Sequence, residues 1–249
     1  MRHLIVFLSL LVLPGIACTF NVQMQPQSEG LTEAPGPSPV PATQVGIPGG
    51  GQALQGPNID YKGIGFILDP TLGSRLYVYD DAITIDGATA HHIRFALNPE
   101  EYCQTWCLMV YPVAEFEQAF GSLAFPPNGY RGGAAVVFKA QEATLSFQNG
   151  SGDRTLETFG QDHYGVSNES LNYVFRGYSA DGQYGVFVQI PMHAASLPDV
   201  APTIASDVDE ILDYNGQAAE SMNALTPEDF TPNLDLLDAF VSSIRVTAP

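Results

Sequence analysis

The clearest hydrophobic pattern in the chain lies between residues 172 and 191, where apolar and polar positions alternate. The alternation places apolar residues such as Phe175 and Val188 opposite each other on one face and mostly polar residues on the other. Asp181-Gly182 separates the two runs and is a strong hairpin signal, because a type I′ turn needs positive φ at both central residues. We therefore predict a β-hairpin with a two-residue loop.

A three-residue loop with a bulge at Gly182 is the alternative register, and it would set Arg176 opposite Val186. Because side chains alternate between the two faces of a sheet, this slip moves a strand's whole apolar set to the other face. The two-residue register separates apolar from polar positions better, but it leaves Val174 and Phe187 on the polar face. We therefore expect a helix or loop to cover part of that face.

Shorter apolar or alternating runs before the hairpin predict further strands. These runs cover residues 63–68, 75–79, 90–97, 107–111, 134–140 and 143–148. Between two of them, Val113, Phe116 and Phe120 recur at the spacing of a short helix.

After the hairpin, apolar residues recur at helical spacing in two segments. Ser206 or Asp207 can cap the first, and Thr231-Pro232 is a start signal for the second. Strands grouped first and helices grouped last predict an α+β fold, in which an antiparallel or mixed sheet is covered by C-terminal helices. On element order alone, the fold analogy to test is a Mog1/PsbP-like α/β/α sandwich, which carries no function with it.

The N-terminus has the organisation of an export signal. Arg2-His3 precede residues 4–13, which are apolar apart from Ser9. Such a run is too short to span a bilayer and is typical of a signal peptide. We therefore assign residues 1–17 to a signal peptide, which places the rest of the chain outside the cytoplasm.

Cys18 follows Gly15-Ile16-Ala17, and this segment resembles the lipobox of bacterial lipoproteins, which ends in the cysteine that becomes diacylated. It departs from that pattern at Gly15, where leucine is usual, and the same residues fit ordinary signal cleavage. Lipidation is favoured because an unmodified Cys18 would leave a lone thiol before a structureless segment. We therefore expect a lipid anchor on the outer face of the cell membrane; without lipidation the protein would be secreted.

Residues 18–58 are expected to form a disordered tether. Between Thr19 and Asn58 there are seven prolines and no lysine or arginine. A segment of this composition buries too little apolar surface to offset the entropy lost on ordering. It would space the folded domain from the membrane; the rival interpretation is a proline-rich recognition segment. The remaining residues, 59–249, have the length of a single globular domain.

Charge restricts the partners of this domain. The chain has 27 Asp and Glu residues against 9 Lys and Arg, which gives a formal net charge of −18. Nucleic acid is not an expected partner, because phosphate binding needs a basic patch and the lysines are only Lys62 and Lys139. Electrostatic adhesion to anionic lipid is disfavoured for the same reason, which leaves the acyl group as the membrane tether.

Cys103 and Cys107 are the cysteines left once Cys18 is lipidated, and outside the cytoplasm we expect them to form a disulfide, with Cys107 starting a strand. A zinc site with His91 or His92 is the alternative, but a CxxxC spacing without a second ligand pair is weak support. Because the two histidines are adjacent on a strand, their side chains point to opposite faces. The sequence contains no motif for a cofactor or metal.

The polar segment 149–168 is predicted to be a loop that feeds the hairpin, and it is rich in potential binding groups. Loops on a rigid scaffold are where binding sites usually lie. A ligand site in this segment would be formed by Arg154, Glu157, Asp162, His163 and Asn168.

Residues 145–159 (LSFQNGSGDRTLETF) and 171–191 (LNYVFRGYSADGQYGVFVQIP) resemble a group of uncharacterised bacterial lipoproteins. Members of that group carry a similar FQNGxGxR stretch, a YxFxG…DGxYxV hairpin and a proline-bounded exit. The resemblance covers roughly residues 108–198. It supports the lipoprotein class and implies no activity and no site residue.

These features predict an extracytoplasmic, lipid-anchored domain without catalytic activity, which binds a small ligand or another envelope protein. One alternative is a hydrolase that uses Asp162 and His163 with an acidic partner from Glu157 or Glu169, which general acid–base catalysis would need within hydrogen-bond reach. The other is a purely structural envelope module, without a pocket lined by convergent polar groups.

The anchor can be tested by mass spectrometry of the mature N-terminus. We expect a first residue of Cys18 carrying a diacylglycerol mass, because the odd cysteine and the following tether favour lipidation. A Cys18→Ala variant is the control and should appear in the soluble extracytoplasmic fraction. A mature chain with an unmodified Cys18 would contradict the anchor.

Overall fold

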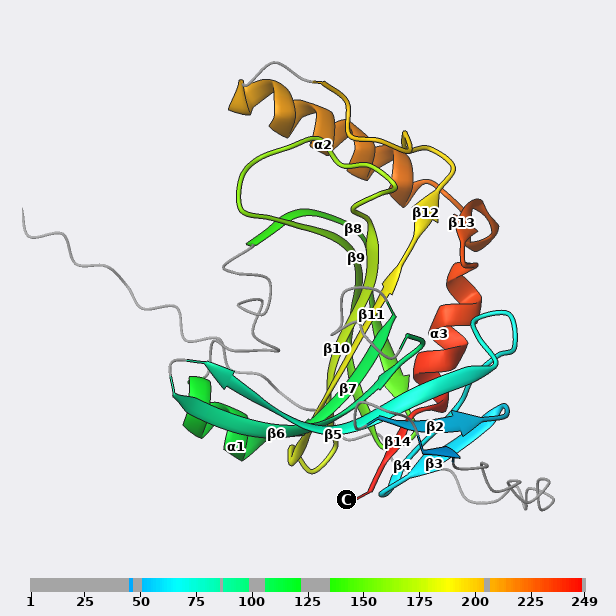
Figure 1. Cartoon of the computed structure of the whole chain (residues 1–249). Coiled ribbons are helices and arrows are strands. Elements are labelled where there is room, and N and C mark those ends of the chain that lie inside the picture. The colour runs from blue at the N-terminus through cyan, green and yellow to red at the C-terminus, as the bar shows by residue number, and fades with distance from the viewer. Residues whose placement is uncertain are drawn as a thin grey trace, which may run out of the picture. The chain divides into compact units, whose positions relative to one another are not determined.

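The computed structural model describes residues 45–46, 51–85, 87–98, 106–121, 135–203 and 207–247. All of them belong to one compact unit, Pro39–Pro249. The predicted signal peptide, Cys18, Cys103 and most of the predicted tether lie outside the described residues. The described part combines an extensive antiparallel sheet with helices, which is the α+β class expected from the order of elements (Figure 1).

Within the described ranges, the main sheet contains nine strands in the order β1-β2-β5-β6-β7-β11-β10-β9-β8, and neighbouring strands are antiparallel. Its strands are β1 (Val45–Gly46), β2 (Gln52–Gln55), β5 (Arg75–Ile85), β6 (Ala88–Ala96), β7 (Cys107–Pro112), β8 (Ala135–Phe147), β9 (Gly150–Gly160), β10 (Asn172–Ser179) and β11 (Tyr184–Pro191). Two small sheets, β14-β4-β3 and β12-β13, accompany it. They are formed by β3 (Asn58–Tyr61), β4 (Ile64–Ile67), β12 (His193–Ala194), β13 (Phe230–Thr231) and β14 (Arg245–Val246).

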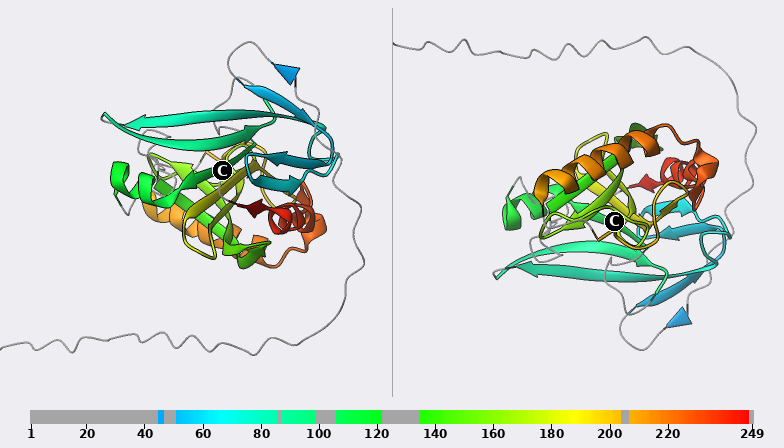
Figure 2. Two further views of the ribbon diagram at one scale, coloured as in Figure 1. Left: turned by 90° about the horizontal axis from the view of Figure 1, so that it is seen from below. Right: turned by 90° about the horizontal axis from the view of Figure 1, so that it is seen from above.

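The helices among the described residues are α1 (Val113–Phe120), α2 (Val208–Asn223) and α3 (Leu234–Ser243), with a 3-10 turn at Pro227–Asp229 ahead of α3. Helices α2 and α3 both contact β8, and Figure 2 shows them grouped on the side away from the β5–β6 hairpin. Helix α1 contacts β6 and β7 instead. None of these described helices combines the length and the apolar character needed to cross a bilayer.

Strands β10 and β11 form the predicted hairpin. Phe175 pairs with Val188, so the predicted register is confirmed, but the loop is longer than the predicted two residues, because β10 ends at Ser179 and β11 begins at Tyr184. The predicted type I′ geometry is wrong, because Gly182 has positive φ (70°) and Asp181 does not. The Asp181 carboxylate accepts hydrogen bonds from the Ser179 hydroxyl (2.6 Å) and from a backbone N–H two residues on (3.0 Å). These side-chain bonds hold the turn in another conformation.

The main sheet buries apolar side chains on both of its faces. The first face and the C-terminal helices form the larger core, to which Phe95, Tyr173, Phe175, Val188, Leu237 and Phe240 belong. The second face has a smaller cluster that contains Val174 and Phe187. Helix α1 joins this cluster through Phe116, whose ring centroid lies 4.2 Å from that of Tyr111. The cover expected over Val174 and Phe187 is therefore present.

The predicted loop at 149–168 is wrong over most of its length. Residues Gly150–Gly160 form β9, which pairs with both β8 and β10. The polar residues of this segment predicted contact with water. In the structure their hydrogen-bond partners come from neighbouring strands and from α3. The strands predicted at 134–140 and 143–148 are one strand, β8, interrupted by a bulge at Gln141, where φ is 53°.

The folded unit begins before the predicted boundary at Ile59. Strand β2 pairs with β5 in the main sheet, and its Leu54 is fully buried. Residues 52–58, which composition assigned to the tether, therefore belong to the fold. The strand has only four residues and is flanked by glycines and a proline, so its hydrophobic pattern is too short to be recognised within the proline- and glycine-rich segment.

The helix starts follow ordinary capping chemistry. Asp207 caps α2 as predicted, and its side chain accepts a backbone N–H of the first turn (2.9 Å). The start predicted at Thr231-Pro232 is displaced, because Thr231 ends β13 and Asn233 is the residue that caps α3. Asn233 Oδ1 accepts the Leu236 N–H at 3.3 Å.

A buried charged residue ties α3 to the sheet. Arg154 on β9 is buried against the larger core, and its guanidinium donates to Asp238 of α3 (3.2 Å) and to the carbonyl of Gln141 in the β8 bulge. The hydroxyl of Tyr173 donates to the other oxygen of Asp238 (3.0 Å). Burial, followed by the charge of Asp238, raises the pKa of Tyr173, so this hydroxyl keeps its proton and stays a donor.

Replacing Asp238 by alanine should destabilise the fold strongly. The substitution leaves the buried guanidinium of Arg154 and the hydroxyl of Tyr173 without their shared acceptor, at a cost of about 2–4 kcal/mol in the free energy of unfolding. Urea unfolding followed by the fluorescence of Trp106, which is buried beside Phe240, measures the loss.

Asp235→Ala is the matched control, because Asp235 is an exposed carboxylate in the first turn of the same helix. Removing it forgoes only a helix-dipole interaction, worth less than about 1 kcal/mol. Equal losses for the two variants would contradict the role of Asp238.

Candidate functional site

The structure does not bring the five predicted site residues together. Arg154 and Glu157 are three positions apart on β9, so their side chains lie on opposite faces of the sheet. Arg154 belongs to the Asp238 network of the larger core. Glu157 lies on the second face, where its side chain is only 1% exposed.

The carboxylate of Glu157 is fully occupied by its neighbours. Arg176 donates to both of its oxygens (2.9 and 2.8 Å), and the hydroxyl of Thr155 donates to one of them (2.6 Å). Lys139 on β8 is the cross-strand partner of Glu157, and its ammonium nitrogen lies 3.9 Å from the carboxylate. A buried carboxylate held by two cations is a structural ion pair, and its oxygens are already occupied by protein donors.

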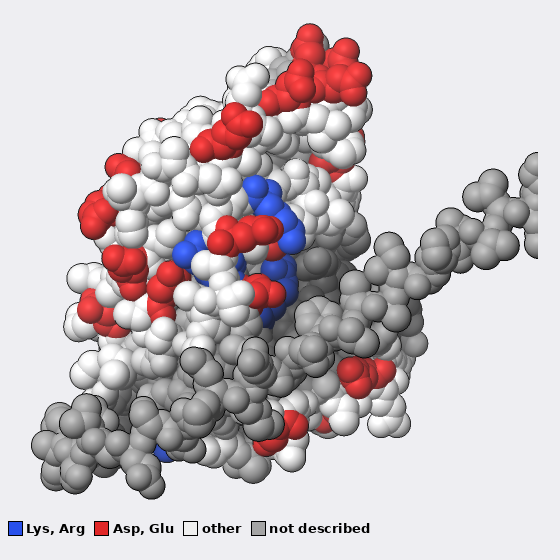
Figure 3. Space-filling model, turned by 180° about the vertical axis from the view of Figure 1, so that it is seen from behind, with Lys and Arg blue, Asp and Glu red and all other residues white. Residues whose placement is uncertain are grey.

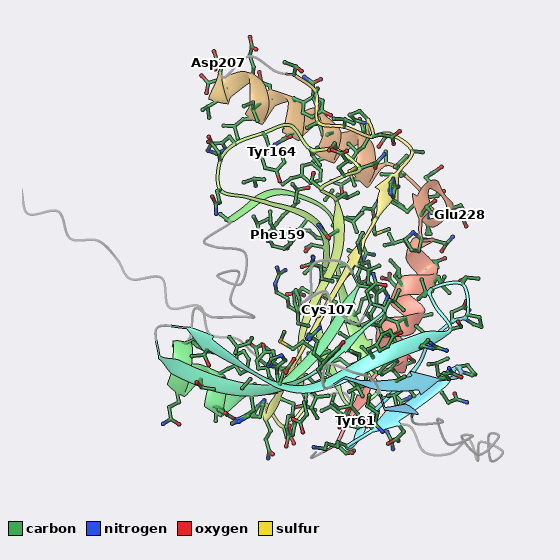
Figure 4. All side chains as sticks on the ribbon, viewed as in Figure 1. Tyr61, Cys107, Phe159, Tyr164, Asp207 and Glu228 are labelled. Carbon is green, nitrogen blue, oxygen red and sulfur yellow. The ribbon has the colours of Figure 1, made fainter. Side chains whose placement is uncertain are left out.

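Asp162 and His163 lie in an exposed turn after β9. The turn lies between Phe159 and Tyr164, which Figure 4 labels below α2, and the Tyr164 hydroxyl donates to the Phe159 carbonyl (2.5 Å). Within the described residues, the carboxylate of Asp162 accepts only the backbone N–H of His163 (2.8 Å), and no carboxylate contacts the imidazole.

Asn168 is buried in the segment that follows this turn. Its amide donates to the Leu197 carbonyl (3.1 Å) and accepts the Ala194 N–H (2.8 Å). It therefore holds the chain that leaves the hairpin. Glu169, the other acid considered for a hydrolase, is exposed.

A pocket with a coherent lining lies elsewhere, where β4, β5, β6, β7 and β11 meet. Its volume is about 210 Å³. We call it the His91 pocket, and it is lined by Lys62, Ile64, Asp80, His91, His92, Ile93, Val110, Pro112 and Tyr184. Ile64, Ile93 and Val110 are buried and provide its apolar surface, whereas the polar groups other than the buried His92 come from residues nearer solvent.

A tight turn positions Lys62 at the pocket. Tyr61 pairs with Ile64, so β3 and β4 are joined by a two-residue loop in which Lys62 and Gly63 both have positive φ (47° and 76°). This is the type I′ geometry of β-hairpins, with glycine at the position that tolerates it best. The turn directs the Lys62 ammonium to Asp80 on β5, and both side chains are about half exposed.

His91 is held by the first turn of α1. Glu115 accepts both the backbone N–H of His91 (2.9 Å) and a hydrogen bond from its Nδ1 (2.6 Å). Burial acts to raise the pKa of Glu115, but the two hydrogen bonds from His91 outweigh it and hold this pKa below its ordinary value. With Nδ1 donating to a carboxylate, the neutral imidazole carries its lone pair on Nε2, which is then an acceptor or a base.

His92 behaves differently from its neighbour. The side chain of His91 is 70% exposed, whereas His92 is buried at 2% exposure, as expected for adjacent residues on opposite faces. Burial lowers the pKa of His92 to about 4, and Arg94 adds to this against the opposing effect of Asp81. His92 is therefore neutral at neutral pH and contributes to packing.

The His91 pocket combines several groups that can contact a ligand. It joins an apolar surface to an imidazole acceptor, an ion pair and a tyrosine, but no serine, threonine or cysteine is among the described lining residues. Sequence reasoning missed the roles of Lys62, Asp80, Glu115 and Tyr184. His91 and Glu115 are 24 positions apart and meet only through the pairing of β6 with β7, so no local pattern announces them.

Figure 3 shows acidic side chains scattered over one face of the molecule and concentrated at one end of α2. Asp207, Asp209 and Glu210 lie at the N-terminus of that helix, where its dipole stabilises negative charge. Among the described residues, no three His, Cys, Asp or Glu side chains are grouped so that they could hold a metal ion.

Cys107 starts β7, as expected, and is fully buried. Its disulfide with Cys103 stays a prediction, because Cys103 lies outside the described residues. No family model, no curated protein and no solved structure matches the chain.

The buried state of His92 predicts a specific loss of stability in mild acid. Its pKa is about 4 in the folded protein and 6.5 ordinarily, so the unfolded chain binds an additional proton between these values. The stabilisation is fully present above pH 6.5 and is lost as the pH falls toward 4, by up to about 3 kcal/mol. The free energy of unfolding should be measured from pH 7.5 to 4 for the natural protein and His92→Gln.

The difference between the two proteins isolates His92, since carboxylates titrate in both. His193→Gln, a change at an exposed histidine, should keep the natural pH dependence. If the His92→Gln variant keeps the same slope between pH 6.5 and 4.5, the assignment to His92 is wrong.

Proposed function

We propose that this protein is an extracytoplasmic binding domain, anchored through a lipid on Cys18 and spaced from the membrane by its proline-rich tether. The anchor and export are supported by the N-terminal signal pattern and by the resemblance to bacterial lipoproteins. The tether is supported by the composition of residues 18–44, whereas β1 (Val45–Gly46) and residues 52–58 belong to the fold.

The observation that carries the binding function is the His91 pocket. His91 lines this pocket together with apolar residues, and its Nδ1 is bonded to Glu115, so Nε2 is left as an acceptor. This lining suits a small apolar group with a hydrogen-bond donor at one end. The pocket volume of about 210 Å³ is below the range of roughly 300–1,000 Å³ that is common for small-molecule sites. We therefore propose that one ring or a short aliphatic group enters it, from a small ligand or from a side chain of another envelope protein.

A non-enzymatic role is favoured over the hydrolase. Glu157 is saturated by Arg176, Thr155 and Lys139, and His163 has no contact to a carboxylate side chain within the described residues. A purely structural module would have no use for the convergence of Lys62, Asp80, His91 and Tyr184 on one pocket. If the pocket binds no ligand, the purely structural module becomes the favoured interpretation.

For the fold, we propose the three-layer α/β/α arrangement of the Mog1/PsbP group. Its support is that α1 packs on the second face of the main sheet, whereas α2 and α3 pack on the first. The analogy concerns architecture alone and implies no ligand.

Binding in the His91 pocket can be measured with p-cresol, a ring of suitable size that carries a hydroxyl donor. We expect p-cresol to bind in the millimolar range and to shift the imidazole signals of His91 in a nuclear magnetic resonance titration. Toluene should bind more weakly, because it lacks the donor. His91→Ala should weaken p-cresol binding by about two- to tenfold, the value of one neutral hydrogen bond.

His163→Ala is the matched control, since it removes an exposed histidine from another part of the fold. It should leave p-cresol binding unchanged. Absence of saturable binding, or equal binding of toluene and p-cresol, would refute the binding role of this pocket.

A further inference from the structure

A second cavity lies on the other side of β5, near the start of that strand. Its volume is about 530 Å³, within the range of roughly 300–1,000 Å³ of small-molecule sites. We call it the Arg75 pocket, and its lining residues are Gln55, Ser74, Arg75, Tyr77 and Leu97. None of them belongs to the His91 pocket.

Arg75 differs from the other described cations in the partner of its side chain. Lysines and arginines in the described ranges form ion pairs with carboxylates in six cases: Lys62, Arg94, Lys139, Arg154, Arg176 and Arg245. Arg75 contacts a neutral amide instead: the side-chain oxygen of Gln55, in the orientation that satisfies the amide, accepts from Nε (3.2 Å) and Nη2 (3.0 Å). In a chain with 27 acidic residues, a guanidinium bonded to an amide is suited to receive an anion from outside.

The pairing of Gln55 with Arg75 also fixes the geometry of the guanidinium. The two residues are direct cross-strand partners on β2 and β5, so their side chains leave the same face side by side. A guanidinium has five N–H donors, and the amide of Gln55 takes two of them. A planar fork held in this way is preorganised for a carboxylate, which it binds through two parallel hydrogen bonds.

The rest of the lining fits a polyhydroxylated ring. Tyr77 is two positions from Arg75 and therefore points to the same face of β5, where its half-buried ring can pack against the C–H face of a sugar. Leu97 is held close by Gly73, where an added Cβ would lie 2.5 Å from a Leu97 methyl carbon. The Ser74 hydroxyl and the Gln55 amide can exchange hydrogen bonds with sugar hydroxyls.

We propose that the Arg75 pocket binds a carboxylate-bearing saccharide, with the carboxylate on Arg75 and the sugar ring against Tyr77 and Leu97. This site is independent of the His91 pocket. The ligand is either a free sugar acid or a uronic-acid unit of a polymer, since both present the same group to Arg75.

The test is a titration of the folded domain, followed by calorimetry or nuclear magnetic resonance, at constant ionic strength because exposed charges are screened by salt. The probes are D-glucuronate, D-glucose and acetate, which separate the contributions of sugar and carboxylate. We expect millimolar binding of glucuronate, and binding at least about tenfold weaker for glucose and acetate. A galacturonate trimer compared with its monomer then distinguishes the sources: tighter binding of the trimer assigns a polymer, and equal binding assigns a free sugar acid.

Arg75→Gln should weaken glucuronate binding by at least about tenfold, because it removes the charge-assisted pair of hydrogen bonds. Arg75→Lys should recover only part of the affinity, since an ammonium cannot bind bidentately. Arg245→Gln is the matched control: Arg245 is also an exposed arginine on a strand, but it pairs with Asp60 (2.8 Å) outside the pocket. Circular dichroism and the thermal midpoint establish that the variants are folded.

Four results would overturn the proposal. If acetate binds as well as glucuronate, the pocket does not recognise a sugar, and if glucose does, it does not recognise a carboxylate. Loss of binding in Arg245→Gln equal to that in Arg75→Gln would show a nonspecific effect of charge. Absence of glucuronate binding up to about 50 mM, well above a millimolar dissociation constant, would also refute it. None of these outcomes bears on p-cresol binding, so the two sites can fail separately.

Discussion

The contact between Arg154 and Asp238 is the interaction on which the arrangement of sheet and helices depends. It places a charge on the core face of β9, where a guanidinium without a carboxylate would be costly. Asp238 satisfies it from α3, Tyr173 fixes the second carboxylate oxygen, and the carbonyl of Gln141 brings in the bulge of β8. One helix, two strands and a bulge therefore share a single hydrogen-bond network. Apolar contacts alone would allow α3 to slide, whereas this network defines one position.

The second face of the sheet follows the same rule with other residues. Glu157 lies between Arg176 and Lys139, while Arg94 pairs with Asp81 (3.1 Å). Both faces of β9 thus carry a buried charge with its partner on a neighbouring element. Because period-two alternation decides which face each side chain joins, the network on one face cannot substitute for that on the other. This separation explains why Arg154 and Glu157, close in sequence, cannot share a ligand.

The sequence predicts the features that depend on local pattern. Alternation gave the register of the β10–β11 hairpin, and helical spacing gave α1, α2 and α3. Local pattern fails where a polar residue has its hydrogen-bond partner far away in the sequence. The polar residues of β9 suggest a loop, because their partners Asp238 and Arg176 lie on other elements. The candidate pockets were missed for the same reason. His91 and Glu115 acquire meaning only when β6 pairs with β7, and the Gln55–Arg75 pair requires a strand that composition assigned to the tether.

Strand β5 links the two candidate pockets and also keeps them apart. It carries Arg75 of one and Asp80 of the other, and an odd separation of five positions directs the two side chains to opposite faces. The registers of β5 with β2 and β6 run without a bulge, so this alternation holds along the paired length. The pockets cannot merge into one site, and a ligand in one does not contact a ligand in the other. Two independent sites are therefore the simplest consequence of the register.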